Sequence, residues 1–395
     1  MKFLCFWGND IFVGSNNEDS HGNNAGSVYV YEKPTTVWLQ TQKLLAQSGV
    51  VDQNLGNAVS ISGNRAIIGA EGDTENGVDS GAAYVFEYNA GTWGFTTKIL
   101  PNDGNFNLKF GHDVSLDGDR VIISSLAIVS LVLGSYGGSA YIFDLTNGSW
   151  NQTVKLVGDD DQFYGDSVSL FGDRAVVGDT GDTVNGSNSG LVYVYDLISG
   201  NWLESFQLIP NDGFPQVQFG QSLSLSNDRL LVGSGIKATG FGGSAYIFDF
   251  NLGVWSQTDK LEAFGLTGDE HFGAAVSLSA GRSLVGAYSD INNNTGVTAG
   301  AAYIFEVTGS SWNQVAKIYS SDGEIGDLFA RSIFLQDNRA VIGVPGDNDN
   351  GTDSGSAIIL KRYLVVGFKP ISYLPVMALL VTTLEIQPLS LEIIP

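Results

Sequence analysis

The sequence predicts an all-β fold, a seven-bladed β-propeller with four-stranded antiparallel blades. The first observation behind this prediction is an internal repeat of about 55 residues, because self-similarity at a fixed period marks repeat architectures. The second is a pair of aromatic markers that keep one spacing in most repeats. The third is composition, since 51 glycines and a hydrophobic content of 43% among 395 residues are typical of a turn-rich β domain.

The repeat is most visible at an arginine that follows a turn-forming pair such as Gly118-Asp119. This arginine recurs at Arg65, Arg120, Arg174, Arg229, Arg282 and Arg339. A seventh copy lies upstream in residues 8–14, where Asp10 stands in the place of the arginine. The aromatic markers are a tyrosine and a tryptophan nine residues later, in the pairs Tyr29 and Trp38, Tyr84 and Trp93, Tyr141 and Trp150, Tyr193 and Trp202, Tyr246 and Trp255, and Tyr303 and Trp312.

Each unit is predicted to form four short strands. The first alternates apolar and polar residues, as in residues 168–170, and the pair Gly172-Asp173 then supplies the positive φ values of a tight hairpin turn. The second strand follows at once, as in residues 174–178, before a polar loop rich in Gly, Asn and Asp. The third strand, as in residues 139–143, is apolar on both faces, and the fourth begins at the tryptophan, as in residues 150–156.

A third strand that is apolar on both faces needs a packed sheet on each side. Blades arranged radially around an axis meet this need. A linear solenoid of the same units is the alternative, although it would need polar caps at both ends. We therefore interpret the tryptophans as packing between blades, and the arginines as structural residues copied with the repeat.

The repeat assigns residues 1–362 to a single propeller domain. Residues 1–7 are expected to pair as the first strand of unit one, and we expect a weak closure of the ring near the termini. Residues 363–395 form an atypical apolar tail that either closes the ring or lies outside the fold. Three prolines interrupt it, and no apolar run approaches the roughly 20 residues that a helix needs to span a bilayer.

Charge and cysteine content exclude several classes of function. The chain has 19 Lys and Arg against 42 Asp and Glu, a net charge of −23 that is spread along its length. Nucleic acids and anionic membranes select for clustered basic charge, so neither is an expected partner. Any membrane association is expected only through the tail or through segments beyond this sequence. The single cysteine, Cys5, excludes an intrachain disulfide and a thiolate metal cluster.

Two short motifs recur in register with the strands and carry a resemblance to a known family. Phe-Gly opens the first strand at Phe110-Gly111, Phe219-Gly220 and Phe272-Gly273, with Leu55-Gly56, Tyr164-Gly165 and Phe329-Ala330 at the same place. The second motif is Gly-Ala-Pro-like, as in Gly69-Ala70-Glu71, Gly286-Ala287-Tyr288 and Gly343-Val344-Pro345. Residues 8 to about 360 resemble the FG-GAP repeats of integrin α subunits and of secreted bacterial proteins. Kelch propellers are the competing family, but their double glycine occurs in only two units here, at Gly137-Gly138 and Gly242-Gly243.

The resemblance implies a binding or adhesion module that works outside the cell or at the cell surface. Its partner would be a protein or a glycan, engaged through loops on one face of a propeller that we expect to be monomeric. Two loops, residues 126–134 and 236–241, break the repeat and are candidate partner contacts. The resemblance also implies calcium in the loops of some blades.

Two polar loops between the second and third strands are the calcium candidates. Their acidic residues are Asp347, Asp349 and Asp353 in unit seven, and Asp73, Glu75 and Asp79 in unit two. Calcium prefers six to eight oxygen ligands, which a loop of alternate Asp and Asn with a turn-forming Gly can supply. The unit seven loop departs by one residue from the family's calcium pattern, since Asn350 rather than Asp precedes Gly351. The alternative is that both loops are ordinary solvated turns.

Catalytic motifs give no support for an enzyme. The three histidines, His21, His112 and His271, lie at unrelated repeat positions, and neither a nucleophile elbow nor a phosphate loop occurs. We therefore expect no catalytic activity. Two alternatives stay open: an enzyme or enzyme-accessory propeller of the polysaccharide-processing type, and a structural spacer within a larger secreted protein. An enzyme should place His, Glu, Asp or Tyr from adjacent blades in the central funnel.

Overall fold

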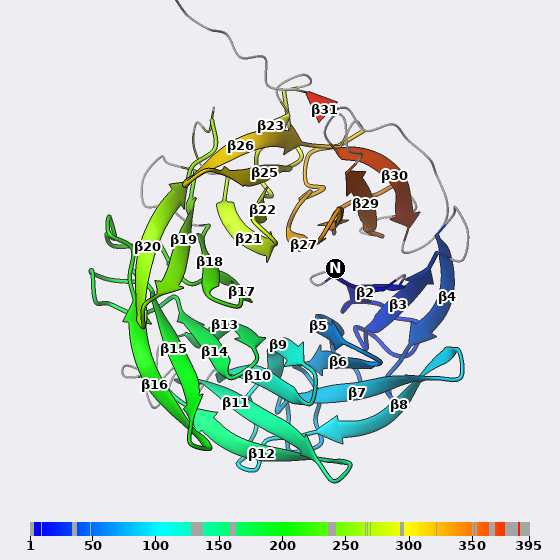
Figure 1. The fold of residues 1–395 in the computed structure, drawn as a ribbon. Coiled ribbons are helices and arrows are strands. Elements are labelled where there is room, and N and C mark those ends of the chain that lie inside the picture. Colours follow the sequence, from blue (N-terminus) through cyan, green and yellow to red (C-terminus); the bar gives the residue numbers. More distant parts are fainter. Residues whose placement is uncertain are drawn as a thin grey trace, which may run out of the picture.

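The chain forms a closed ring of seven β-sheets around a central axis (Figure 1). The computed structural model describes residues 4–8, 10–33, 38–47, 49–127, 137–158, 163–235, 242–264, 266, 268, 270–292, 296–320, 322–349, 351, 354–362, 368–375 and 386–387. Each sheet is one blade, and its first strand lies nearest the axis while its fourth strand lies at the rim (Figure 1). The predicted seven-bladed propeller is confirmed, and the solenoid alternative is wrong because the sheets close into a ring.

The blades follow the sequence in order, each an antiparallel meander of four strands. Blade 1 contains β1 (Leu4–Trp7), β2 (Asp10–Ser15), β3 (Ser27–Glu32) and β4 (Leu39–Leu44), and blade 2 contains β5 (Leu55–Ser62), β6 (Arg65–Ala70), β7 (Ala82–Asn89) and β8 (Thr92–Ile99). Blade 3 contains β9 (Phe110–Asp117), β10 (Arg120–Ala127), β11 (Gly137–Thr146) and β12 (Ser149–Leu156), and blade 4 contains β13 (Tyr164–Phe171), β14 (Arg174–Asp179), β15 (Leu191–Ile198) and β16 (Asn201–Leu208).

Blades 5 to 7 repeat the pattern with small additions. Blade 5 contains β17 (Ser222–Ser226), β18 (Arg229–Ser234), β19 (Ser244–Asn251) and β20 (Val254–Leu261). Blade 6 contains β21 (Phe272–Ser279), β22 (Arg282–Ala287), β25 (Ala301–Thr308) and β26 (Ser311–Ile318). Blade 7 contains β27 (Ser332–Gln336), β28 (Arg339–Val344), β29 (Ser356–Arg362) and β30 (Phe368–Pro375). In blade 6 a short hairpin, β23 (Ile291–Asn292) and β24 (Val297–Thr298), stands between the second and third strands, and β31 (Ile386–Gln387) pairs with β26.

Tight two-residue turns join the first and second strands. Positive φ falls on the first turn residue, as at Gly118 and Gly172, whereas the Asp that follows each has no positive φ. The prediction that both residues of the pair supply positive φ is therefore wrong for these turns. Blade 6 differs, because both Ala280 and Gly281 have positive φ.

The two halves of the FG-GAP motif meet across boundaries between neighbouring blades. A Cβ atom added to Gly69 of blade 2 would lie 2.1 Å from the carbonyl oxygen of Gly111 in blade 3. The same holds for Gly178 of blade 4 and Gly220 of blade 5, again at 2.1 Å. The glycines are therefore required because two backbones approach more closely than any side chain allows.

Seven buried apolar clusters fill the spaces between the seven neighbouring pairs of blades. In blade 1, Val28 and Val30 of β3 pack toward blade 2, whereas Tyr29 and Tyr31 pack toward blade 7. This alternation confirms that third strands are apolar on both faces because each face meets a different blade. The cluster that joins Ile11, Val13 and Trp38 to Val341 and Ile359 closes the ring between the first and last blades.

The repeated arginines of blades 2 to 4 form ion pairs with the next blade, as a structural role predicts. Arg120 of blade 3 pairs with Asp144 in its own blade at 2.7 Å and with Asp173 in the turn of blade 4 at 2.7 Å. Its guanidinium also lies 5.1 Å from the ring centre of Trp202 in blade 4. In blade 1, Asp10 takes this place and accepts a hydrogen bond from Trp93 Nε1 of blade 2.

Buried and partly buried serines make a second set of links near the axis. The hydroxyl of Ser115 in β9 accepts a hydrogen bond at 3.0 Å from the backbone N–H of Leu170 in β13. Equivalent bonds join the first strands of blades 2 through 7. In each the serine hydroxyl accepts from the leucine N–H of the next blade, in the pairs Ser60 and Leu116, Ser169 and Leu225, Ser224 and Leu278, and Ser277 and Leu335.

The first and last blades adjoin in the ring. β1 supplies the innermost strand of blade 1, which confirms the prediction for residues 4–7. Beyond the predicted domain boundary at residue 362, β30 pairs with β29 as the fourth strand of blade 7. Strands of the segment 363–395 therefore pair with blades 6 and 7. The described part of the chain contains no helix that could cross a membrane.

Candidate functional site

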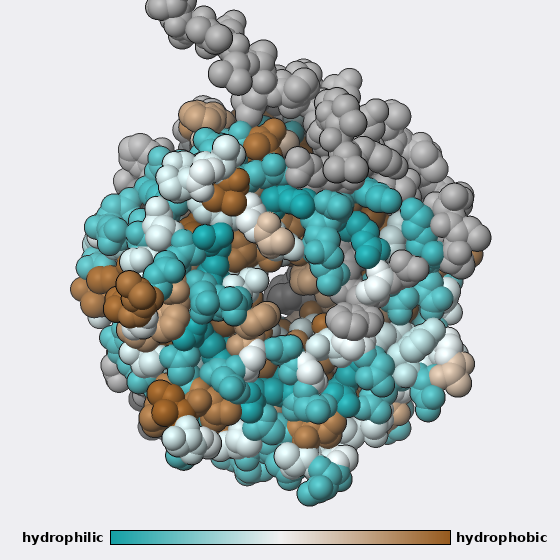
Figure 2. Space-filling view, viewed as in Figure 1, coloured by the Kyte–Doolittle hydropathy of each residue, from teal (hydrophilic) through white to brown (hydrophobic). Residues whose placement is uncertain are grey.

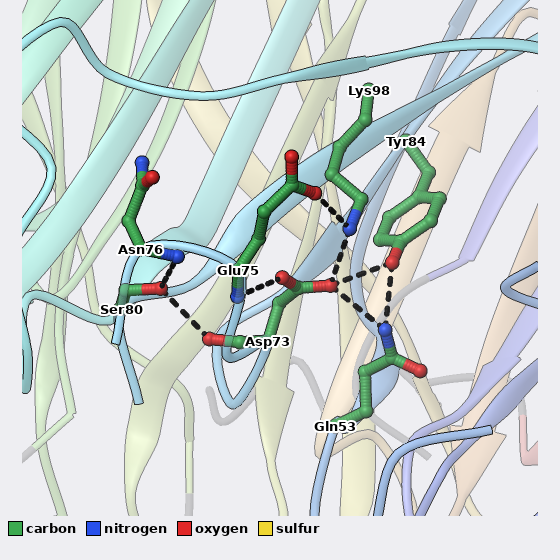
Figure 3. A network of polar contacts seen from close by, with 7 residues as sticks. All are labelled: Gln53, Asp73, Glu75, Asn76, Ser80, Tyr84 and Lys98. Carbon is green, nitrogen blue, oxygen red and sulfur yellow. Dashed lines mark hydrogen bonds and ion pairs between the residues drawn. The ribbon is translucent and has the colours of Figure 1, made fainter. Parts of the chain in front are cut away.

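One face of the ring carries the loops between second and third strands together with the crossings between blades. We call it the loop face, and the opposite face, with the hairpin turns, the turn face. On the loop face of blade 2, Asp73 Oδ2 accepts hydrogen bonds from Gln53 Nε2 at 2.8 Å, from the hydroxyl of Tyr84 at 2.6 Å and from Lys98 Nζ at 3.0 Å (Figure 3). Lys98 also pairs with Glu75 at 2.8 Å. Lys98 of β8 thus supplies the positive charge that neutralises the two loop acids.

This network sets the charge state of the blade 2 loop. Burial alone would raise the pKa of Asp73, but hydrogen bonds from Tyr84, the Glu75 backbone, Lys98 and Gln53 outweigh it and hold the pKa below its usual value. For Lys98, burial acts to lower the pKa, and hydrogen bonds with Glu75, Tyr84 and Asp73 raise it above the usual value. Both groups are therefore charged at neutral pH.

The same arrangement recurs because the tyrosine of the third strand and the lysine of the fourth are register partners, as at Tyr84 and Lys98. Each lysine lies near the ring of its tyrosine and pairs with an acid of a nearby loop. The sets are Tyr29, Lys43 and Glu18; Tyr141, Lys155 and Asp103; Tyr246, Lys260 and Asp212; and Tyr303, Lys317 and Asp290. Blade 4 has Gln207 in the place of the lysine, opposite Tyr193.

Blade 7 departs from this pattern. Ile358 stands in the place of the tyrosine, and its partner on the fourth strand is Tyr373 rather than a lysine. In the described part of the chain, no lysine or arginine pairs with Asp327, Asp347 or Asp349. These acids, with Asp322 and Glu324, line a pocket of about 10 Å³, which is the volume of about one water-sized sphere.

The carboxylates of blade 7 repel one another. Burial, followed by the nearby charges of Asp347, Glu324 and Asp322, raises the pKa of Asp327 to about 6, although a backbone hydrogen bond from Glu324 opposes the shift. Burial and the same neighbours raise the pKa of Asp349. A cation placed among them would relieve this repulsion.

The two predicted calcium loops therefore differ in structure. Asp347 and Asp349 are brought together with Asp327, whereas Asp353 lies outside the described residues. Asp73 and Glu75 come together around Lys98, and the backbone carbonyl of Asp79 accepts a hydrogen bond from the N–H of Lys109. Within the described ranges, no group of three or more acidic, histidine or cysteine side chains is placed so that it could hold a metal ion. Calcium at either loop stays a prediction.

A second cluster lies where the loop face meets the axis. His112 Nδ1 lies 2.9 Å from Glu71 Oε2, and His112 Nε2 lies 3.9 Å from Asp166 Oδ1. These three residues belong to blades 3, 2 and 4. Asp113, beside His112, accepts hydrogen bonds from the backbone N–H groups of Val168 and Val114, and burial raises its pKa to about 6.

This cluster was not among the predicted sites, because the histidines lie at unrelated positions of the repeat when they are compared along the chain. Two repeat positions carry the signal: the residue after Phe-Gly, which is His112 or Asp166, and the residue after Gly-Ala, which is Glu71. In the ring these positions of neighbouring blades face each other. On the other side of the axis they bring Arg331 to 4.5 Å from the ring centre of Tyr288. The candidate partner-contact loops, residues 126–134 and 236–241, lie outside the described residues except for Leu126 and Ala127.

Comparison with known proteins agrees with this architecture. The sequence matches the FG-GAP repeat at residues 38–86, 93–143, 150–195, 202–248, 255–305 and 312–360. Each match starts at the tryptophan of one blade and ends in the third strand of the next. No curated protein sequence matches the chain.

Two solved structures share the fold at low sequence identity. One is a Bacteroides fragilis protein provisionally named a 6-phosphogluconolactonase, with a TM-score of 0.59, 12% identity, and coverage of 96% of this chain and 98% of that one. The other is a hypothetical selenium-binding protein from Sulfolobus tokodaii, with a TM-score of 0.59, 9% identity, and coverage of 92% of this chain and 89% of that one. At such identities the likeness shows the propeller fold alone.

Proposed function

The chain belongs to the FG-GAP repeat family, and on that premise we propose that it is a non-catalytic binding module that works outside the cell or at its surface. The propeller is a monomer, and its loop face binds a protein or a glycan. Calcium in the blade 7 loop stabilises that face. The observation that carries the calcium part is a group of carboxylates around an ion-sized pocket, at the one blade where the third strand lacks its tyrosine.

The blade 7 residues suit calcium chemically. Asp327, Asp347 and Asp349 offer hard oxygen donors, and the pocket has room for one ion. Loop carbonyls and water would complete the six to eight ligands that calcium takes. In the five blades that have the fourth-strand lysine, its ammonium group already neutralises a loop acid. The repeat itself therefore favours a cation beside the loop acids of blade 7. Calcium would hold the second-to-third-strand loop of blade 7 against the crossing from blade 6.

Calorimetric titration of calcium tests this proposal. We expect one site with a dissociation constant of about 0.1 to 1 mM, the range of extracellular modules. Asp347→Asn and Asp349→Asn should each weaken binding at least tenfold. Asp173→Asn, in an exposed turn on the opposite face, is the matched control and should bind like the wild type. No heat of binding, or equal binding in all four proteins, would leave the blade 7 loop as an ordinary turn.

The binding role has its own test. Immobilised protein is assayed against extracellular matrix proteins and a glycan array, in millimolar calcium and again in chelator. Calcium-dependent capture that Asp347→Asn loses supports a loop-face binding module. Capture that is indifferent to calcium and to this substitution would separate the partner surface from the calcium loop.

A catalytic function is the second candidate because Glu71, His112 and Asp166 come from three adjacent blades and meet near the axis. A histidine between two carboxylates can transfer protons to or from a bound substrate. The matching test is hydrolysis of polysaccharides by the wild type and by His112→Asn. Turnover that this variant loses would favour an enzyme of the polysaccharide-processing type over a binding module.

A further inference from the structure

The arginine of blade 5 lacks the ion pair with a turn carboxylate of the next blade that three of its counterparts make, although its guanidinium lies 5.4 Å from the ring centre of Trp312 in blade 6. Arg65 and Arg120 place Nη1 at 2.9 and 2.7 Å from turn carboxylates of the following blade, Asp119 and Asp173. Arg174 lies 3.5 Å from Asp228, which is a third example. In the part of the chain that the structure describes, Arg229 bonds only within its own blade, to Asp249 through Nε and Nη2.

The missing partner has a cause in the sequence. The turn of blade 6 reads Ala280-Gly281, so Gly281 stands where blades 3, 4 and 5 have Asp119, Asp173 and Asp228. A pocket of about 330 Å³ opens there, lined by Arg229, Asp249, Asn251, Leu278, Ala280 and Gly281 among others. Arg229 is accordingly 32% exposed, against 13 to 20% for the other arginines that pair with acids. We call this space the Arg229 pocket.

The charges around the Arg229 pocket leave the outer edge of the guanidinium for a ligand. Of the two acids that line it, Asp249 is already paired with Arg229 through two bonds. Asp228 lies beside Arg174 of the preceding blade. Nη1, the atom that binds a turn carboxylate in blades 2 to 4, makes no hydrogen bond to a described residue here. A planar guanidinium edge is suited to a carboxylate.

An exposed leucine stands next to the Arg229 pocket. Asn251 lines the pocket, and Leu252 after it is fully exposed, at 104% of its reference area. Leu252 also has a positive φ of 52°, at a hairpin position where other blades have Ala90, Asn147, Ser199 and Gly309. Leu252 is the one branched apolar side chain among these hairpin residues, and its full exposure leaves it available to an apolar group of a partner. Apolar patches near the rim, over β16 and β20, are visible in Figure 2.

We propose that the Arg229 pocket and Leu252 form a second binding site, on the turn face, for an acidic side chain of a partner protein flanked by an apolar residue. The partner's carboxylate takes the place that the turn aspartate of the next blade holds elsewhere in the ring. The apolar residue packs on Leu252. This site lies on the face opposite the calcium loop and is independent of it.

The first test asks whether the Arg229 pocket accepts a carboxylate at all. The double substitution Ala280→Gly with Gly281→Asp rebuilds the Gly-Asp turn of blades 3 and 4, and Ala280→Gly with Gly281→Asn is the uncharged control. We expect the aspartate variant to melt about 1 to 2 °C above the asparagine variant at low salt, with the difference gone in 1 M NaCl. Equal melting temperatures at low salt would overturn the proposal.

The second test measures ligand binding directly. The Nε–Hε signal of Arg229 is followed by NMR in arginine-labelled protein during titration with the N-acetylated, C-amidated dipeptide Leu-Asp. A saturable shift, absent with Leu-Asn and lost in the Gly-Asp variant, supports the proposal, and Leu252→Ser should weaken it several-fold. An equal shift with sodium chloride would mean an adventitious ion only. A stronger response to glucuronate than to Leu-Asp would assign the Arg229 pocket to acidic sugars. Either the sodium chloride result or the glucuronate result would overturn the proposal of a protein carboxylate.

Discussion

At the scale of single residues, the loops of the loop face differ in how their carboxylates are neutralised. Blade 2 holds its own cation, because Lys98 lies 3.0 Å from Asp73 and 2.8 Å from Glu75. Blade 7 has Tyr373 at the register position of that lysine and gathers Asp327, Asp347 and Asp349 instead. Two exchanges at one register pair, Ile358 for the tyrosine and Tyr373 for the lysine, therefore separate a loop whose acids have a lysine partner from a loop whose acids lack that lysine.

Removing the resident cation of blade 2 should make its loop respond to calcium. Lys98→Met leaves Asp73 buried beside Glu75 without its ammonium partner, which should lower the free energy of unfolding by about 3 kcal/mol. Calcium at millimolar concentration should restore part of that loss, whereas magnesium should restore less. Urea denaturation with each ion and with chelator gives the measurement. A loss that calcium leaves unchanged would show that Asp73, Glu75 and Asp79 are not a latent calcium set.

Asp113 should give the protein a defined dependence on pH. Burial raises its pKa from 3.8 to about 6, so folding favours the protonated form. Its contribution to stability is therefore present below about pH 4 and is lost as pH rises through about 6. The facing charges are His112 and Asp166. Asp113→Asn should gain about 2 kcal/mol of stability relative to the wild type between pH 4 and pH 7.5, measured by urea denaturation across that range. An unchanged difference between the two proteins would contradict the shift.

At the scale of elements, the turn, strand and motif of each unit are constrained by the neighbouring blade. The glycines of the FG-GAP motif illustrate this, because Gly178 leaves no space for a Cβ atom against the carbonyl of Gly220. The arginine after the turn illustrates it again, since its second partner lies on the next blade. A unit of about 55 residues is thus incomplete on its own and is finished by the unit that follows.

Gly178→Ala tests this dependence. Its Cβ would meet backbone at 2.1 Å, so blades 4 and 5 must move apart, and we expect a loss of more than about 3 kcal/mol in unfolding free energy. Gly94→Ala is the matched control, because no atom lies within 4 Å of a Cβ there and its φ is not positive. Differential scanning calorimetry of both variants decides the matter. Similar melting temperatures would show that the close approach does not constrain the ring.

The strands could be predicted from the sequence because apolar alternation, Gly-Asp turns and the Tyr to Trp spacing are local. The interactions that cross between blades could not. Glu71, His112 and Asp166 are about 40 to 55 residues apart in the chain, and only the ring brings them together. The positive φ at Gly172 without one at Asp173 likewise depends on the turn's actual geometry. The role of Lys98 was missed because register, rather than spacing, places it beside Tyr84.

At the scale of the whole molecule, closure depends on packing between the first and last blades. Ile11, Val13 and Trp38 of blade 1 pack against Val341 and Ile359 of blade 7. No strand from one end of the chain joins the blade formed by the other end, in the sheets that the structure describes. Side-chain packing between blades 1 and 7 therefore closes the ring. Blade 7 is also the blade whose loop contains Asp347 and Asp349.

Hydrogen exchange of the backbone amides, with calcium and with chelator, tests the central claim that blade 7 is the calcium-dependent part of a binding propeller. We expect calcium to slow exchange at least tenfold in residues 344–356 and in the crossing at 320–328. The equivalent loop of blade 2, at residues 70–82, should be unchanged because Lys98 already pairs with its acids. Exchange that calcium leaves unaltered in blade 7, or slows equally in both loops, would show that blade 7 is not the calcium-dependent part of the propeller.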